Sequence, residues 1–178
     1  MGLKFKNHSP RAKWWDYSRE ATYFITICTK NKHPFFGTIN NKTVQLSSIG
    51  ELVRIEWLKG PEIRPDMNIV LGEFVVMPDH FHALVSIGAN AFNQEINCLR
   101  NSDGEFMGYN GFQPQTKNLA SLIRGFKSAV TIQARQIDPT FKWYKLYHDV
   151  IVQSSDAYER IENYIQLNPV RWDEKQGN

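Results

Sequence analysis

Two runs of β-forming residues, separated by only three residues, most constrain how this chain can fold. Residues 68–76 and 80–87 are rich in β-branched and aromatic side chains, and Met77-Pro78-Asp79 lies between them. A parallel pair of strands needs a crossover connection of about a dozen residues or more. The second strand must therefore pair back on the first, and the chain must contain an antiparallel sheet.

Strands and helices interleave along the rest of the chain. The other expected strands are residues 21–29, the two arms of a hairpin at 35–39 and 43–46 around Asn40-Asn41, and residues 142–152. The expected helices are residues 48–60, residues 119–135 and a last helix that is capped by Ser155 or Asp156 and ends at Pro169. This order predicts an α+β fold of the ferredoxin-like or RRM-like kind, an antiparallel sheet packed by helices.

The first helix shows both a start signal and an apolar stripe. Ser48 and Glu51 have the spacing of a capping box, in which each side chain satisfies a free backbone N–H of the first turn. Leu52, Ile55 and Leu58 follow at helical spacing, so we expect them to form the packed face.

Length and composition indicate one globular domain over residues 1–178. The chain is 42% apolar and 22% charged, and its apolar runs are too short to span a bilayer. Its basic start lacks the apolar stretch of a signal peptide, and its two cysteines are too few for a disulfide framework. We therefore expect a cytoplasmic protein without a membrane partner. Residues 88–117, rich in Asn and Gly, are expected to be a long loop or an insertion.

Positive charge gathers in the second half of the chain. Between residues 106 and 148 there are six basic residues and a single acidic one, although the whole chain has a net charge of only +3. Such a cluster suits a phosphate backbone or, equally, a solvated helix face. We take Arg124, Lys127, Lys142 and Lys145 as candidate DNA-binding residues.

The strand at 80–87 carries a histidine pair. Successive strand residues point to opposite faces, so His80 and His82 share one face. The other face is uniformly apolar and is the better core candidate; it comprises Phe81, Ala83, Val85 and Ile87. Two imidazoles at this spacing can chelate one divalent metal, although they can also be satisfied structural residues. A metal would need a third ligand from elsewhere.

The last helix carries a tyrosine and an amide on one face. Tyr164 and Asn168 are four residues apart, so they project together. They could supply a nucleophile and an oxygen ligand for Mg²⁺ or Mn²⁺. A tyrosine packed in the core and an asparagine before a helix-ending proline would give the same pattern.

Taken together, these motifs resemble the REP-associated tyrosine transposases and their insertion-sequence relatives of the IS200-like, single-tyrosine His-hydrophobic-His (HUH) family. Met-Pro-Asp-His-Phe-His at 77–82 is similar to the family's M-P-N-H-x-H signature, and Tyr-Ile-Gln-Leu-Asn-Pro at 164–169 to its tyrosine motif. Residues 17–18, 23–29 and 36–37 resemble the family's opening, and residues 124–128 its G-x-F-K-S helix. The likeness covers nearly the whole chain, in order.

The resemblance implies an HUH endonuclease that acts in DNA transposition and recombination of mobile elements. It implies that His80, His82 and Asn168 hold Mg²⁺ or Mn²⁺ and that Tyr164 is the nucleophile. The product would be a 5′-phosphotyrosine intermediate on single-stranded or hairpin DNA, repetitive palindromic elements included. A monomer and a homodimer are both compatible with it.

Two other functions remain open from the sequence. The chain could be a domesticated, non-catalytic ferredoxin-like module that binds DNA or RNA. It could also be a metal-dependent hydrolase built on His80 and His82, which would turn over substrate without a protein–DNA adduct.

Overall fold

The chain folds into a four-stranded antiparallel sheet with helices on both faces, which confirms the α+β class. The computed structural model describes residues 15–98 and 116–176. Two short 3-10 turns lie at Lys30–Lys32 and Pro65–Met67. The strands and helices, in chain order, are β1 (Ala21–Cys28), β2 (Gly37–Asn40), β3 (Thr43–Leu46), α1 (Ser48–Leu58), α2 (Gly60–Ile63), β4 (Ile69–Val76), β5 (His80–Ile87), α3 (Ala91–Cys98), α4 (Leu119–Ile137), β6 (His148–Val152), α5 (Ser155–Gln166) and α6 (Asn168–Gln176).

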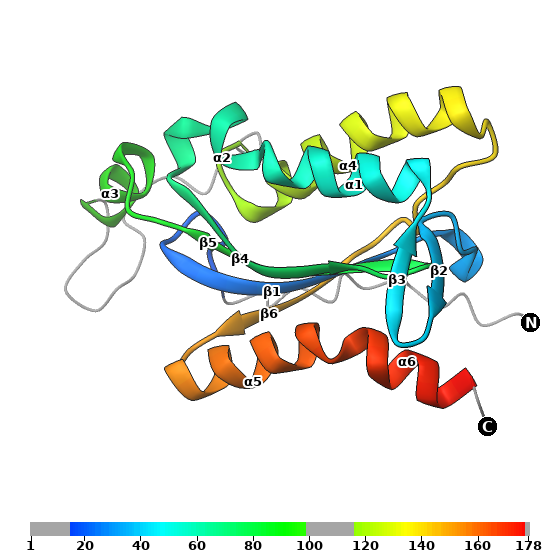
Figure 1. The fold of residues 1–178 in the computed structure, drawn as a ribbon. Helices are drawn as coiled ribbons and strands as arrows, with labels where there is room; N and C mark the ends of the chain where they lie inside the picture. The colour runs from blue at the N-terminus through cyan, green and yellow to red at the C-terminus, as the bar shows by residue number, and fades with distance from the viewer. Residues whose placement is uncertain (1–14, 99–115, 177–178) are drawn as a thin grey trace, which may run out of the picture.

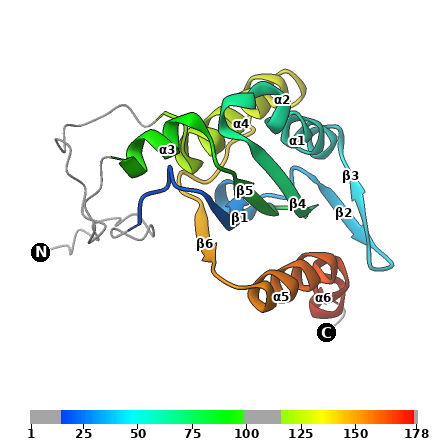
Figure 2. The same ribbon diagram turned by 90° about the vertical axis from the view of Figure 1, so that its left-hand side faces the viewer.

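The strands of the main sheet lie in the order β4-β5-β1-β6, and every neighbouring pair is antiparallel. Helices α1, α2 and α4 cover one face of this sheet, while α5 and α6 lie along the other (Figures 1 and 2). The histidine strand β5 is therefore central. Its neighbour β1 places Thr26 opposite His82 and Cys28 opposite His80.

The hydrophobic core fills the space between the sheet and helices α1 and α4. The expected apolar face of β5 lies there with no exposed surface; its residues are Phe81, Ala83, Val85 and Ile87. Trp57 of α1 is the largest buried side chain, and its ring centroid lies 5.1 Å from that of Phe81 and 5.2 Å from that of Phe126. The other face of β5 is thereby left for α5, α6 and the histidines.

The N-cap of helix α1 lies one residue earlier than expected, and the helix buries a different face. Ser47, not Ser48, is the N-cap, and its hydroxyl accepts a hydrogen bond from the backbone three residues on, at 3.1 Å. Trp57 is buried, whereas Ile55 and Leu58 of the expected face are 40% and 47% exposed. Because apolar residues surround this helix, their spacing does not decide which of them pack.

The last strand is shorter than expected, and a lysine bonds two carbonyl oxygens of its expected first half. The Lys127 ammonium donates hydrogen bonds to the carbonyl oxygens of Tyr144, at 2.7 Å, and of Lys145, at 3.4 Å. Only Trp143 forms an isolated bridge, with Thr29. Regular pairing with β1 starts at His148.

The C-terminal segment is two helices rather than one, so the expected end at Pro169 is wrong. Ser154, rather than the expected Ser155 or Asp156, caps α5, since its hydroxyl accepts a hydrogen bond from the Ala157 N–H at 3.2 Å. Leu167 keeps a right-handed helical conformation between α5 and α6. Pro169 falls in the first turn of α6, where a missing N–H costs nothing. The two helices thus continue one another across the sheet.

The expected hairpin is present as β2 and β3, apart from the main sheet. Asn41 and Lys42 form its turn with positive φ angles of 50° and 62°, as a two-residue hairpin turn requires. The Lys42 N–H donates a hydrogen bond to Asp173 Oδ2 at 3.1 Å, which ties the hairpin to α6.

The segment expected as a loop or insertion is partly helical. Residues 91–98 form α3, which begins after a turn built by Asn90 and Asn93. Residues 99–115 lie outside the described residues, so the single-domain assignment with an insertion stays a prediction.

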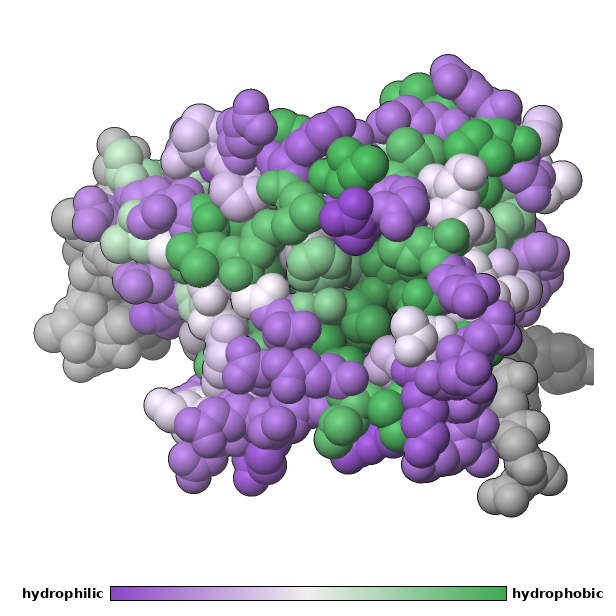
Figure 3. All heavy atoms as spheres, in the orientation of Figure 1, coloured by the Kyte–Doolittle hydropathy of each residue, from purple (hydrophilic) through white to green (hydrophobic). Residues whose placement is uncertain are grey.

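Edge strand β4 carries exposed apolar side chains. Val70 is 59% exposed, and Ile63 nearby is 62% exposed. Apolar residues gather across this side of the molecule between the upper and lower helices (Figure 3). In the part of the chain that the structure describes, no helix is both long and apolar enough to cross a membrane.

Candidate functional site

The two histidines lie side by side on the face of β5 that α5 and α6 cover. Their ring centroids are 4.6 Å apart, and the rings are nearly perpendicular at 73°. His82 is 6% exposed, and the side chain of His80 is 13% exposed. The strand alternation thus brings them together, as the sequence predicts.

Each imidazole has its Nδ1 atom occupied by a neighbouring oxygen. The Asp79 carboxylate lies 2.5 Å from His80 Nδ1, and because a carboxylate only accepts, that nitrogen donates. The Thr26 hydroxyl lies 2.8 Å from His82 Nδ1 and can accept from it in the same way. An imidazole held at Nδ1–H presents the lone pair of Nε2, which is how metal-binding histidines are usually oriented.

Burial keeps His82 neutral. Loss of water around the ring and, to a smaller extent, the neighbouring His80 together lower the pKa of His82 from 6.5 to about 3. At neutral pH the ring is therefore uncharged, and when Nδ1–H donates to Thr26 its Nε2 keeps a free lone pair. A neutral imidazole is the form that binds metal ions.

Tyr164 meets the histidine pair from α5. Its ring centroid is 5.4 Å from that of His82 and 6.0 Å from that of Phe24, which stacks on His82 at 5.3 Å. The residue is still 37% exposed, so a substrate can reach it. Arg171 lies with its guanidinium carbon 5.7 Å from the Tyr164 ring centroid. The sequence had not singled out Arg171, because it follows the proline at which the helix was expected to end.

Asn168 occupies the junction between α5 and α6. Because the two helices continue one another, positions 164, 168 and 172 share one helical face. Tyr164 contacts His82, and Trp172 contacts His80 with 5.5 Å between ring centroids. Asn168 therefore lies between two residues that touch the histidines, and it is only 7% exposed. No hydrogen bond joins its side-chain amide to any residue that the structure describes.

The donor atoms fit a hard divalent metal only if an amide oxygen takes part. Within residues 15–98 and 116–176, no group of three or more His, Cys, Asp and Glu side chains could hold a metal ion. His80 and His82 offer two nitrogens, and the candidate for a third donor is the Asn168 oxygen. Both imidazoles are held at Nδ1 by neighbouring oxygens, which directs their Nε2 atoms to a ligand, so the residues present fit such a group.

A glycine in β4 lets α5 approach the sheet this closely. The strand has a register shift between Leu71 and Phe74. At Gly72, an added Cβ would lie 2.7 Å from the Tyr158 hydroxyl and 2.9 Å from Leu84 Cβ. Burial raises the pKa of Tyr158, as expected for a tyrosine that packs on the sheet rather than one that faces the histidines.

The candidate DNA-binding residues do not form one group. Lys142 and Lys145 line a groove of about 500 Å³ together with Arg135 of the same basic segment and with Lys30, which lies outside that segment. Arg124 is exposed on α4 and does not line this groove.

The fourth candidate, Lys127, is engaged within the protein. Burial lowers the pKa of Lys127, its ammonium bonds the backbone carbonyls of Tyr144 and Lys145, and it lies 5.9 Å from the Trp143 ring centroid. The Arg124, Lys127, Lys142 and Lys145 assignment stays a prediction, with Lys142 and Lys145 the best placed.

Comparison with known proteins finds a relative by sequence and solved structures with a similar fold. No family model matches the chain. A Haemophilus influenzae protein described as an uncharacterized protein is 34% identical over 169 residues, covering 94% of this chain and 91% of the relative. The structure of a REP-associated tyrosine transposase bound to a REP hairpin superposes with a TM-score of 0.55 over 90% of this chain and 74% of that chain, at 16% identity. That likeness confirms the expected resemblance at the level of the fold.

Proposed function

Because this chain belongs to the same family as the Haemophilus influenzae protein and has the fold of a REP-associated tyrosine transposase, we propose that it is a metal-dependent DNA strand transferase with Tyr164 as its nucleophile. One observation carries the proposal. The Tyr164 ring packs on His82, one of two imidazoles whose Nδ1 atoms are held by Asp79 and Thr26.

The reaction is a transesterification. The Tyr164 hydroxyl oxygen loses its proton and attacks a DNA phosphorus, forming a tyrosine–5′-phosphate bond. The bond from phosphorus to the 3′ oxygen breaks, and that oxygen takes up a proton to leave a free 3′-hydroxyl. Because the new phosphodiester replaces the old one, rejoining needs no external energy source.

The residues around the tyrosine prepare this step. Phe24 and His82 fix the Tyr164 ring, which reduces the freedom lost when it meets the phosphate. The Arg171 guanidinium beside the ring favours a negatively charged oxygen nearby. Mg²⁺ or Mn²⁺, held by His80, His82 and Asn168, would supply polarisation of the scissile phosphate.

Single-stranded or hairpin DNA is the proposed substrate. The structural match was solved bound to a REP hairpin. In this chain, a groove near the end of β1 is lined by four basic residues, Lys30, Arg135, Lys142 and Lys145. Lys30 lies two residues after Cys28, the last residue of β1, which pairs with His80 in the sheet. Clustered cations of this kind bind the phosphate backbone without reading its sequence.

Covalent trapping tests the proposal. The protein is incubated with Mn²⁺ and a DNA hairpin that has unpaired arms of randomised sequence, and the products are separated under denaturing conditions. Tyr164→Phe should abolish the protein–DNA adduct while leaving folding and hairpin binding intact, because it removes one hydroxyl that makes no hydrogen bond to the described residues. Tyr158→Phe is the matched control on the same helix and should form the adduct.

Two results would contradict it. An adduct that survives in Tyr164→Phe and disappears in Tyr158→Phe would move the nucleophile. Tight hairpin binding with no adduct from the wild-type protein would make the chain a non-catalytic binding domain.

A further inference from the structure

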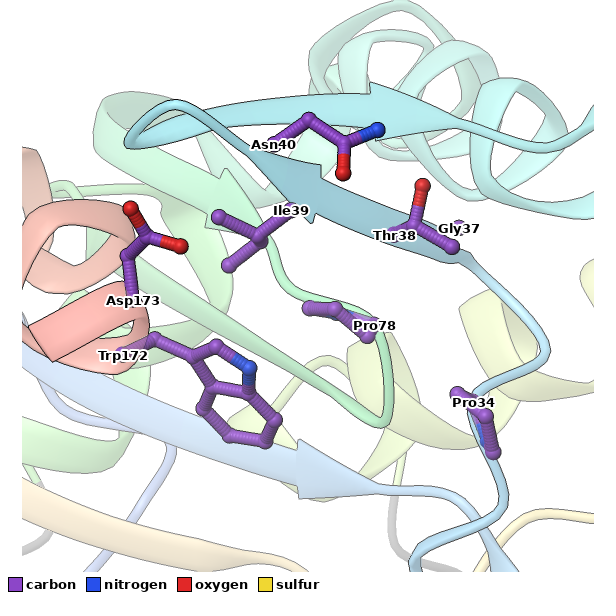
Figure 4. Close-up of a pocket in the computed structure, with 8 residues that line it drawn as sticks. All are labelled: Pro34, Gly37, Thr38, Ile39, Asn40, Pro78, Trp172 and Asp173. Carbon is purple, nitrogen blue, oxygen red and sulfur yellow. The ribbon is translucent and has the colours of Figure 1, made fainter. Parts of the chain in front are cut away.

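Beside the histidine pair lies a pocket that we propose receives one unpaired base of the DNA strand, stacked on Trp172. This inference rests on the proposed function, which brings single-stranded DNA to Tyr164. The pocket has a volume of about 590 Å³ and lies between strand β2, the β4–β5 turn and helix α6 (Figure 4).

Trp172 joins this pocket to the site. Its ring centroid lies 5.5 Å from that of His80, yet the indole also lines the pocket, below Ile39 and beside Pro78 (Figure 4). A flat indole with apolar side chains around it suits the π-face of a base. Base–aromatic stacking is a general way of holding single-stranded nucleic acid without sequence readout.

The charge of the wall favours a base over a phosphate. Asp173 lines the pocket, and its Oδ2 accepts a hydrogen bond from the Lys42 N–H. No lysine or arginine is among the described residues that line it. A carboxylate repels a phosphate but accepts a hydrogen bond from a base amino group. The groove around Lys142 is basic instead, so the groove suits the phosphates of a DNA strand and the pocket suits one of its bases.

Strand β2 adds backbone groups that can meet the edge of a base. Residues opposite each other in an antiparallel pair alternate between hydrogen-bonded and non-hydrogen-bonded positions. The Ser47 N–H donates to the Phe36 carbonyl, so the pair Ile39–Val44 falls in the non-hydrogen-bonded class. The N–H and C=O of Ile39 therefore point away from β3, at the edge that borders the pocket.

The contact between Trp172 and His80 sets where the base belongs in the strand. A phosphate within reach of Tyr164 also lies beside His82 and His80. The nucleotide next to it reaches Trp172 directly. The pocket thus holds the base that flanks the scissile phosphate, and it would align that phosphate with the tyrosine.

An abasic scan tests this pocket separately from the chemistry. The probe is a DNA hairpin with unpaired arms of randomised sequence, in which each arm position in turn lacks its base. Binding of each probe is measured by fluorescence anisotropy for the wild type, Trp172→Leu and Tyr144→Leu. Trp172→Leu keeps an apolar side chain suited to a helix but removes the aromatic face, and circular dichroism checks that it is folded. Tyr144→Leu is the aromatic control in the basic groove.

In the wild type, one arm position should weaken binding by about fivefold to a hundredfold when its base is removed, as loss of one stacked base does. Trp172→Leu should bind all probes alike, and Tyr144→Leu should keep the wild-type pattern. Equal binding of all probes by the wild type, or a pattern unchanged in Trp172→Leu, would overturn the pocket. Adduct formation is followed in parallel. An adduct without the abasic pattern rejects the pocket alone, and the pattern without an adduct rejects the strand transferase alone.

Discussion

Lowering the pH should destabilise the metal-free protein through His82. The ring is 6% exposed, and its burial lowers its pKa from 6.5 to about 3. Above pH 6.5 the imidazole is neutral in both the folded and the unfolded chain. Between pH 6.5 and about 3 only the unfolded chain takes up the proton, so stability falls as the pH falls.

The size of the effect follows from the pKa difference. Each pH unit below 6.5 costs about 1.4 kcal/mol, so the loss is about 2 kcal/mol at pH 5 and on the order of 5 kcal/mol near pH 3. Either figure is a large part of the stability of an ordinary domain.

Urea unfolding with a chelator present, between pH 7 and pH 4, measures this term. Carboxylates also lose stability in acid, so the test is the difference between the wild type and His82→Gln, which cannot titrate. That difference should change by about 1.4 kcal/mol per pH unit below 6.5. His33→Gln, at an exposed histidine, is the control and should follow the wild type. Parallel curves for the wild type and His82→Gln would refute the reasoning that burial keeps this ring neutral.

Two further predictions concern the metal ligands and the basic groove. Asp79→Ala should weaken Mn²⁺ binding by about tenfold or more in calorimetric titration, because it removes the acceptor that holds His80 Nδ1. Asp79→Asn keeps an oxygen acceptor and should weaken Mn²⁺ binding less. Equal Mn²⁺ affinities of the wild type and Asp79→Ala would show that Asp79 does not support metal binding. The double variant Lys142→Ala/Lys145→Ala should reduce the salt dependence of hairpin binding, measured by fluorescence anisotropy, by about two phosphate contacts. Lys127→Ala should leave that salt dependence unchanged and lower the stability measured by urea unfolding. An unchanged salt dependence in the double variant would make the groove a solvated surface.

The sequence predicts the centre of this fold better than its periphery. In β5 the alternation of side chains decides both the core face with Phe81 and the site face with His80 and His82, because only one face of that strand is uniformly apolar. Helix α1 offers no such contrast, since Ile55 and Leu58 are as apolar as the Trp57 that is buried. Which face of α1 is buried therefore depends on the tertiary packing of Trp57.

Pro169 hid part of the candidate site from sequence reasoning. A proline after an asparagine is typical of a helix end, but proline is also common in the first turn of a new helix. Arg171 and Trp172, which contact Tyr164 and His80, were lost with that interpretation. The spacing of four residues from Asn168 to Trp172 was the available signal. Lys30 could not be joined to Lys142 by spacing, because only the folded chain brings the two together.

Strand β5 encodes the core on one face and the candidate site on the other. A single-residue slip of this strand against β1 would turn Phe81 toward α5 and both histidines into the core. A chain in that register would bury two imidazoles and would separate His82 from Thr26, so misfolding would remove the candidate site and the core at once. Deletions or insertions within residues 80–87 should therefore be far less tolerated than substitutions, and the same eight residues stand under two independent constraints.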